Sequence, residues 1–488
     1  MLKMIEWSSN ISKRGHIDWG TVIFYLTFVL LGWLNIYAAS YDLENTVELF
    51  DLSGRAGTQL VWIGTSLLLA FVLMKIEVGF YETYAFVFYL FAIFVLLVTL
   101  AVAPDINGSR SWLVLGPIRL QPAEFVKFVI ALALAKVFNI YGFELMRRKS
   151  LLIVAGIILL PTLLVIMQSE TGTALVYLSF VLMLYREGLP GSILFMGISA
   201  ILYFILGIKF SDTQIGLFSL GEIISVACII VSAAGIIWAR SKYKKTAVTV
   251  FLVGGAIFAG GFLLSFLVEN IDYGLVALIA MVAVLLFLIW LFLRYRKKIY
   301  FYVLMFVIGS FVFLESAEYV FYNVLQPHQQ MRIKVTLGME QDLRGSGYHV
   351  GQSKIAIGSG GLTGKGFLNG TQTKLKYVPE QDTDFIFCTI GEEHGFIGST
   401  LILLLFVIFI LRLIHLAERQ TSTFGRVYGY AVACVFLFHL LVNIGMVIGI
   451  MPVIGIPLPF FSYGGSSLWG FTILLFIFLR IDKSRKIR

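Results

Sequence analysis

Ionisable side chains at the ends of long apolar runs are the first candidates for chemistry in this chain. Glu124 and Lys127 open one such run, Glu170 lies between two others, and Asp384 heads a further run directly after a glycine-rich stretch. A charged group at membrane depth is costly, so such groups are functional candidates by default. A carboxylate can take a proton, and a lysine can bind phosphate oxygens. The set therefore suits an amphiphile with an acidic headgroup and a lipid tail.

Each of these groups also has a structural interpretation. Glu124 and Lys127 stand three positions apart, share a helix face and could form an ion pair that joins two helices. Asp384 could cap the helix that follows it. Glu392 and Glu393 lie about two turns deeper and could serve in packing or capping, so their roles stay open. The pattern fits an enzyme acting on a lipid-linked substrate and, nearly as well, a lipid transporter.

The elements that must position these groups are membrane-spanning helices. Of 488 residues, 59% are hydrophobic and only 13% are charged, whereas soluble domains are about 25% charged. Apolar runs near the ~20 residues that a spanning helix needs lie roughly at 20–40, 57–75, 80–103, 123–141, 150–167, 172–186, 190–208, 219–239, 246–268, 273–294, 300–321, 384–411, 427–450 and 467–481. The sequence therefore predicts an all-α polytopic membrane protein with about fourteen transmembrane helices, in which residues 1–488 form a single integral membrane domain.

Basic residues gather in alternate connections between the predicted spans. They lie at Lys13 and Arg14, and within 147–149, 240–245, 294–298, 412–426 and 483–488. With this number of spans, all of these connections fall on one side, and the positive-inside rule makes that side the cytoplasm. Both termini are then cytoplasmic. The net charge of +9 reflects this topology, and no nucleic-acid partner is expected.

One connection, residues 322–383, is much longer than the others and is extracytoplasmic in this topology. Loops of this length are usually functional. It is rich in glycine between Gly345 and Gly366, and it carries basic residues against the positive-inside bias. These are Arg332, Lys334, Arg344, Lys354, Lys365, Lys374 and Lys376. They favour an anionic ligand, with anionic lipid headgroups or a partner protein as the alternatives.

Four ordered motifs make the chain recognisable. They are QPAEFVK at 121–127, GSGYHVGQSKIAIGSGG at 345–361, PEQDTDFIF at 379–387 followed by Gly-Glu-Glu at 391–393, and PLPFFSYGGSS at 457–467. Together they resemble the SEDS family of RodA and FtsW over most of the chain outside roughly 210–300, and residues 364–372 look more like RodA. The family has a core of about ten spans, so the resemblance implies about four extra helices inserted at 210–300.

The resemblance implies a peptidoglycan glycosyltransferase of the bacterial cytoplasmic membrane. Such an enzyme polymerises lipid II into glycan strands at the outer face during cell-wall elongation and shape determination. The implied partners are a class B penicillin-binding protein, which crosslinks the strands, and other membrane proteins of the elongation machinery. The alternatives are an FtsW-like division polymerase and a lipid II transporter without polymerase activity.

The resemblance also assigns roles within the motifs. Asp384 matches the essential aspartate and is expected to be the base that deprotonates the acceptor sugar 4-hydroxyl in an inverting displacement. The departing lipid pyrophosphate needs charge neutralisation, which basic residues such as Arg110 and Lys127, or Mg²⁺ or Mn²⁺, could supply. The expected substrate-binding residues are Arg110, Gln121, Glu124, Lys127, Glu170, Gln352, Ser353, Lys365 and Ser462.

Two positions depart from the family pattern near the expected site. Glu170 stands in Gln-Ser-Glu where the family commonly has Gln-Pro-Asp, so its carboxylate survives but its reach changes. Asp382 stands two residues before Asp384, where histidine is common. Asp382 is therefore a rival for the role of base.

Overall fold

The computed structural model describes residues 16–41, 51–52, 54–106, 108–116, 118–240, 242, 244–264, 266, 272–340 and 345–485. Some basic residues used in the predictions above lie outside these ranges: Lys13, Arg14, Arg344, Lys486 and Arg488. The chain divides into two units. The first consists of Met1–Leu189 and Tyr348–Arg488, and the second of Pro190–Gly347.

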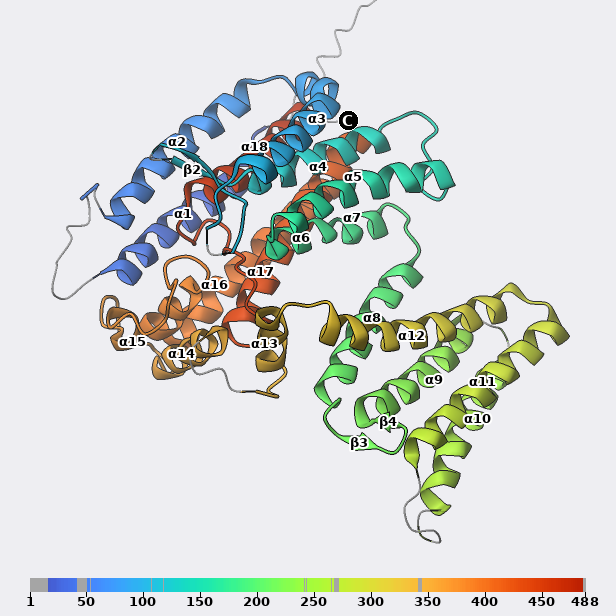
Figure 1. Ribbon diagram of the computed structural model, residues 1–488. Helices are drawn as coiled ribbons and strands as arrows, with labels where there is room; N and C mark the ends of the chain where they lie inside the picture. The colour runs from blue at the N-terminus through green and yellow to red at the C-terminus, as the bar shows by residue number, and fades with distance from the viewer. Residues whose placement is uncertain are drawn as a thin grey trace, which may run out of the picture. The chain divides into compact units, whose positions relative to one another are not determined.

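The first unit is a helical bundle with one short β-hairpin (Figure 1). Its elements are α1 (Trp19–Ser40), α2 (Arg55–Lys75), α3 (Val78–Val102), β1 (Leu113–Leu115), β2 (Ile118–Leu120), α4 (Pro122–Phe138), α5 (Arg148–Met167), α6 (Thr171–Leu178), α7 (Phe180–Arg186), α14 (Ser346–Ser359), α15 (Thr371–Lys374), α16 (Ile386–Glu418), α17 (Thr423–Val447) and α18 (Gly465–Ser484). The strands β1 and β2 pair antiparallel.

The second unit contains a smaller bundle, coloured green to yellow in Figure 1. Its elements are α8 (Gly191–Lys209), β3 (Gln214–Ile215), β4 (Phe218–Ser219), α9 (Leu220–Arg240), α10 (Lys244–Leu264), α11 (Tyr273–Tyr295), α12 (Lys298–Asn323) and α13 (Pro327–Thr336). Helix α9 packs against α8, α10, α11 and α12. The predicted insertion at 210–300 falls within this unit, and its status as an insertion stays a prediction.

The predicted apolar runs all fold as helices. Twelve helices among the described residues are long and apolar enough to cross a membrane. The other two runs correspond to α4, which has 17 residues, and to the shorter apolar segment Thr171–Arg186, which forms α6 and α7. A polytopic helical protein is thus confirmed, while the count of fourteen spans and their orientation stay predictions. The predicted loop 322–383 contains α13, α14 and α15.

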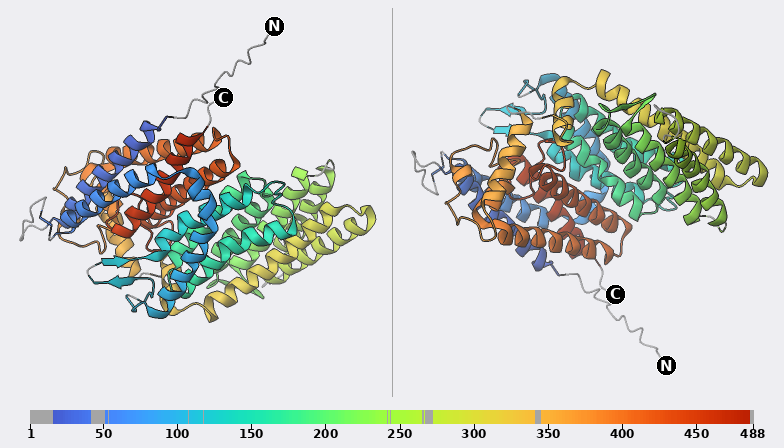
Figure 2. Two further views of the ribbon diagram at one scale, coloured as in Figure 1. Left: turned by 90° about the horizontal axis from the view of Figure 1, so that it is seen from above. Right: turned by 90° about the horizontal axis from the view of Figure 1, so that it is seen from below.

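Helix α4 lies at the centre of the first unit, where it packs against α3, α17 and α18. In Figure 2 the C-terminal helices, coloured red, run among the blue helices from the N-terminal part of the chain. Nearly every side chain of α4 is buried, including those of Glu124 and Lys127. Its alanines at 131, 133 and 135 are completely buried and let neighbouring helices approach closely. Helices from both the N-terminal and the C-terminal parts of the chain therefore surround Glu124 and Lys127.

The glycine run at 358–366 packs backbone to backbone against the first turns of α16. A Cβ on Gly360 would lie 2.0 Å from Gly391 O, and a Cβ on Gly364 would lie 2.1 Å from Glu393 O. Gly364 also has a φ of 81°, which favours glycine. Close backbone contact with α16 therefore explains these two glycines without a bound anion.

The same contact continues where α16 is interrupted. Gly395 has φ 64° and ψ −161°, a conformation that breaks the helical hydrogen-bond pattern. The N–H of Phe396 instead donates to Gly361 O (2.9 Å), and the N–H of Ile397 donates to Leu362 O (3.1 Å). The glycine-rich loop thus satisfies the backbone donors that the kink releases.

Candidate functional site

Asp384 lies two residues before the start of α16, in a segment whose backbone is clamped by the C-terminal part of the chain. Asn443 Nδ2 donates to Asp384 O (2.8 Å) and to Ile456 O (2.7 Å). Ser462 Oγ donates to Thr383 O (2.6 Å). Successive carbonyls of the segment are therefore held by side chains from α17 and from the 457–467 motif.

The carboxylate of Asp384 does not cap the helix that follows it. The N-cap position of α16 is Phe385, and no side-chain bond caps the helix. Within the described residues, the Asp384 carboxylate makes no recorded hydrogen bond or ion pair. Its Oδ2 lies against Gly455, where a Cβ would be only 3.2 Å away. The structure therefore gives no support to the capping alternative.

The surroundings of Asp384 raise the pKa of its carboxyl group to about 7. Burial is the largest cause, because it penalises the charged form. The negative charges of Glu380, Glu170 and Asp382 add to it, in that order. A carboxylate with a pKa near the working pH combines a useful deprotonated fraction with real proton affinity.

Glu170 lies close enough to contribute to the environment of Asp384, and serines hold its own carboxylate. Ser109 Oγ and Ser111 Oγ each donate to Glu170 Oε2 at 3.0 Å. Burial raises the pKa of Glu170, and hydrogen bonds from the two serines and from Gln121 oppose that rise. Gln121 and Asp384 thus both lie close enough to Glu170 to interact with its carboxyl group.

Glu124 and Lys127 form a buried pair that reaches α17. Lys127 Nζ donates to Glu124 Oε2 (2.6 Å), and the two side chains are 1% and 3% exposed. Lys127 Nζ also lies 3.2 Å from His439 Nε2, and His439 Nδ1 lies 3.1 Å from Pro457 O. Since a carbonyl only accepts, Nδ1 must donate, which leaves Nε2 to accept from the lysine. The pair thus supports the 457–467 motif through His439.

Lys365 is ion-paired away from Asp384. Its Nζ donates to Glu392 Oε1 (2.7 Å) and to Thr371 Oγ1 (2.7 Å). The fully buried Glu392 also accepts from the N–H groups of Gln372 and Thr373, both at 2.9 Å. Glu392 therefore organises the loop that contains α15. The expected contact of Lys365 with substrate stays a prediction, and the structure gives this lysine a structural partner.

The remaining predicted substrate residues have different surroundings. Ser462 holds the backbone next to Asp384 through its bond to Thr383 O. Ser353 Oγ instead donates to Val447 O (3.0 Å) and joins α14 to the end of α17. Gln352 is partly buried and Arg110 is exposed. Within the described chain, neither of these two side chains has a recorded hydrogen bond or ion pair.

Three polar residues near Asp384 were not predicted from the sequence. Arg55 pairs with Asp382, while His439 and Asn443 support the Asp384 segment from α17. His439 and Asn443 stand four positions apart inside an apolar run, so they share a helix face. Polar groups within a span are functional candidates, and that signal could have revealed both residues.

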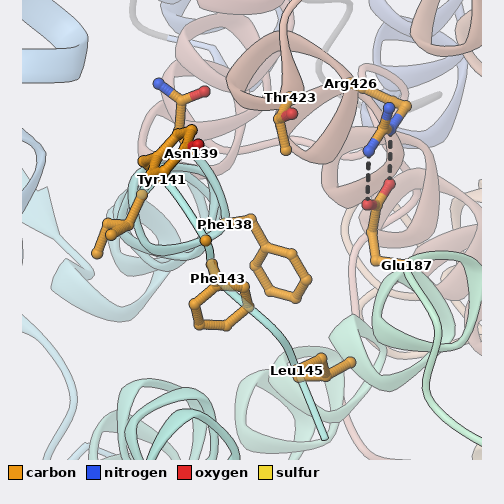
Figure 3. A pocket seen from close by; sticks show the side chains of 10 residues that line it. Phe138, Asn139, Tyr141, Phe143, Leu145, Glu187, Thr423 and Arg426 are labelled. Atoms are coloured by element: carbon orange, nitrogen blue, oxygen red, sulfur yellow. Dashed lines mark hydrogen bonds and ion pairs between the residues drawn. The ribbon is translucent and has the colours of Figure 1, made fainter. Parts of the chain in front are cut away.

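The site around Asp384 is distinct from the cavity shown in Figure 3. That cavity has a volume of about 420 Å³ and is lined by the end of α4, the 139–145 connection, Glu187 and the start of α17. Glu187 and Arg426 form a two-pronged ion pair at its edge, with both bonds at 2.9 Å (Figure 3). Arg426 precedes Asn443 by 17 residues, or about 26 Å along a helix. The cavity therefore lies at the other end of α17 from Asp384.

Known proteins resemble this chain over nearly its whole length. The model of the FtsW/RodA/SpoVE family of cell cycle proteins matches residues 19–220 and 213–487. The peptidoglycan glycosyltransferase RodA of Treponema pallidum is 31% identical over 459 residues, which cover 93% of this chain and 94% of that protein. The peptidoglycan glycosyltransferase MrdB of Escherichia coli strain K12 is 29% identical over 454 residues, which cover 93% and 90%.

Solved structures agree on the fold. One, described as "Structural coordination of polymerization and crosslinking by a peptidoglycan synthase complex", has a TM-score of 0.59 at 22% identity and covers 97% of this chain and 99% of its own. The rod shape determining protein RodA of Thermus thermophilus has a TM-score of 0.52 at 22% identity, with coverage of 97% and 98%. From its motifs, its helical fold and the match to the family model, the chain belongs to the FtsW/RodA/SpoVE family.

Proposed function

We propose that this protein is a RodA-type peptidoglycan glycosyltransferase, which polymerises lipid II into glycan strands during cell elongation. It is a multi-pass protein of the bacterial cytoplasmic membrane. The observation that carries the proposal is the carboxylate of Asp384, which has a pKa of about 7 and a rigidly held backbone beside Glu170 and Gly455. The relatives named peptidoglycan glycosyltransferase support the same activity.

The proposed reaction is an inverting displacement. Asp384 takes the proton of the acceptor sugar 4-hydroxyl while that oxygen attacks the anomeric carbon of the donor, and the lipid pyrophosphate leaves. The pyrophosphate is already a good leaving group and needs positive charge more than a proton. Lys127 is buried and already bonded to Glu124, whereas Arg110 is exposed. Arg110 is therefore the better placed of the two proposed phosphate ligands.

A divalent cation, Mg²⁺ or Mn²⁺, stays part of the proposal as a further source of positive charge. Among the residues that the structure describes, no three His, Cys, Asp or Glu side chains lie together as a metal site. Mg²⁺ bound to phosphates commonly takes only one or two carboxylates from a protein.

The proposed orientation places Asp384 at the outer face of the membrane. The basic connections on the opposite side, among them Arg147 and Arg148, would then be cytoplasmic by the positive-inside rule. Lipid II must present its sugars at the outer face for strands to reach the cell wall. A reporter fused to the C-terminus should therefore read as cytoplasmic, and an extracytoplasmic signal would contradict the proposed topology.

The activity is tested directly with purified protein and lipid II. Glycan strands that separate as a ladder on a gel are the expected product. Lipid II that crosses a vesicle membrane without being polymerised would instead identify a transporter. The elongation role is tested by depletion in the native bacterium, where rounding of cells is expected and filamentation would indicate a division enzyme.

The rate of polymerisation should depend on pH through Asp384. A base acts only when deprotonated, so a pKa of about 7 means that the active fraction falls about tenfold for each pH unit below 7. We expect kcat/KM to rise with pH and to level off above about 7. Glu380→Gln removes one of the negative charges that raise this pKa, and should move the inflection to lower pH. A flat profile between pH 5 and 8 would contradict the assignment of the base.

A class B penicillin-binding protein is the proposed partner. One structural neighbour is described as part of a complex that coordinates polymerization and crosslinking, which supports a transpeptidase partner for this chain as well. Cross-linking in native membranes followed by co-purification should recover such a protein. Repeated recovery of the chain without any penicillin-binding protein would contradict the proposal.

A further inference from the structure

We propose that Arg55 is a positioning residue that reserves the role of base for Asp384 by holding the neighbouring carboxylate of Asp382 in an ion pair. Arg55 is the first residue of α2, and its Nη1 contacts Asp382 Oδ2. The Asp382 side chain is only 5% exposed, whereas that of Arg55 is 55% exposed. The inference rests on the proposed function, because it concerns which of two carboxylates accepts the proton.

The pair is held from both sides. Tyr463 donates its N–H to Asp382 O (2.8 Å), and the Arg55 guanidinium lies 5.9 Å from the centre of the Tyr463 ring. One turn further along α2, Gln59 Oε1 accepts from the N–H of Gly464 (3.3 Å). The start of α2 is therefore joined to the same 457–467 motif that clamps Asp384, which fixes the position of Arg55 relative to Asp382.

The two carboxylates have opposite surroundings. Asp382 has a cation in direct contact, and a buried carboxylate without such a partner would be strongly disfavoured as an ion. Asp384 makes no recorded ion pair in the described chain. The charged groups that influence it are Glu380 and Asp382 on its own segment and Glu170 at the start of α6. The ion pair with Arg55 thus keeps Asp382 ionised and bound, so that Asp382 does not compete with Asp384 for the proton of the acceptor hydroxyl.

The ion pair also compensates for the presence of Asp382, where histidine is common in the family. An acidic residue two positions before the base adds a negative charge to a site that must receive an anionic pyrophosphate donor. Arg55 offsets that charge, because its guanidinium directly contacts the Asp382 carboxylate, which is itself almost completely buried. Arginine keeps its charge at any physiological pH, so the compensation does not vary with pH.

Replacement of Arg55 by alanine tests the inference. Without the cation, Asp382 competes with Asp384 for a proton, so the second of the two carboxyl groups to ionise does so only at higher pH. We expect the inflection of kcat/KM against pH to move upward by about one unit, and the rate at pH 7 to fall about fivefold. Arg55→Lys should restore most of the rate. The double variant Arg55→Ala, Asp382→Asn should return the inflection towards its wild-type position, because the unpaired charge is gone.

Controls separate a positioning role from a merely structural one. Arg147 is 64% exposed and pairs with Glu144 on the surface, so Arg147→Ala should leave the profile unchanged. If Arg55→Ala lowers thermal stability and rate without moving the inflection, or if Asp382→Asn gives no rescue, Arg55 is structural and the inference is wrong. Wild-type protein that makes no glycan from lipid II would overturn the proposed function itself, which is a different result.

Discussion

Asp384→Asn is expected to abolish glycan polymerisation while the protein stays folded. The amide keeps the size of the side chain and leaves the backbone bond from Asn443 to the carbonyl of residue 384 intact. It removes the proton acceptor, and general base catalysis is typically worth about 10²–10⁴-fold. The measurement is the rate of strand formation from lipid II, together with the melting temperature in detergent.

Asp382→Asn is the matched control for that prediction, since it changes the same group two residues away. Polymerisation should continue, because Asp382 is committed to Arg55 rather than to the substrate. The reverse outcome, with Asp384→Asn active at near wild-type rate and Asp382→Asn inactive, would move the role of base to Asp382.

Lys127→Met is expected to destabilise the protein strongly. The change leaves the Glu124 carboxylate buried without its cation, and breaking a buried pair in this way costs about 3–5 kcal/mol. It also removes the donor to His439, which supports Pro457. The fall in stability can be measured by thermal or denaturant unfolding in detergent.

A double variant distinguishes the two roles proposed for Lys127. Glu124→Gln combined with Lys127→Met removes both charges and should recover much of the lost stability. Recovery of stability without activity would support a role in phosphate binding, whereas recovery of both would show that the pair is structural. Lys136→Met is the control. The Lys136 side chain is 31% exposed and its Nζ lies 3.8 Å from Glu82 Oε1, and a partly exposed surface pair of this kind contributes about 0–1 kcal/mol.

The helices could be predicted because their signal is local. A run of apolar residues can be recognised in the sequence regardless of its neighbours, and each predicted run is helical in the structure, with the run 172–186 forming the two helices α6 and α7. The position of Asp384 just before a helix could be predicted in the same way. The hydrogen bonds that hold its backbone could not be predicted, because Asn443 and Ser462 are separated in sequence from the carbonyls they hold by 59 and 79 positions.

The roles of the glycines and lysines in the glycine-rich loop could not be predicted from the sequence either. Its glycines and lysines suggested an anionic ligand, since flexible basic loops often bind phosphate. In the structure, Gly360 and Gly364 allow backbone contact with α16, and Lys365 neutralises the buried Glu392. Composition could not distinguish these roles, because both require small residues and positive charge.

Biogenesis is constrained by the distance in sequence between Lys127 and His439. The two residues are 312 positions apart, so at about 5–20 residues per second the ribosome adds His439 roughly 15–60 s after Lys127. During that interval α4, a 17-residue segment, must be accommodated with only its internal ion pair to offset its charges. A nascent chain released before α17 would already contain Asp384 but none of the side chains that hold it. The hydrogen bonds that hold the carbonyls of Thr383 and Asp384 can therefore form only after Asn443 and Ser462 have been synthesised.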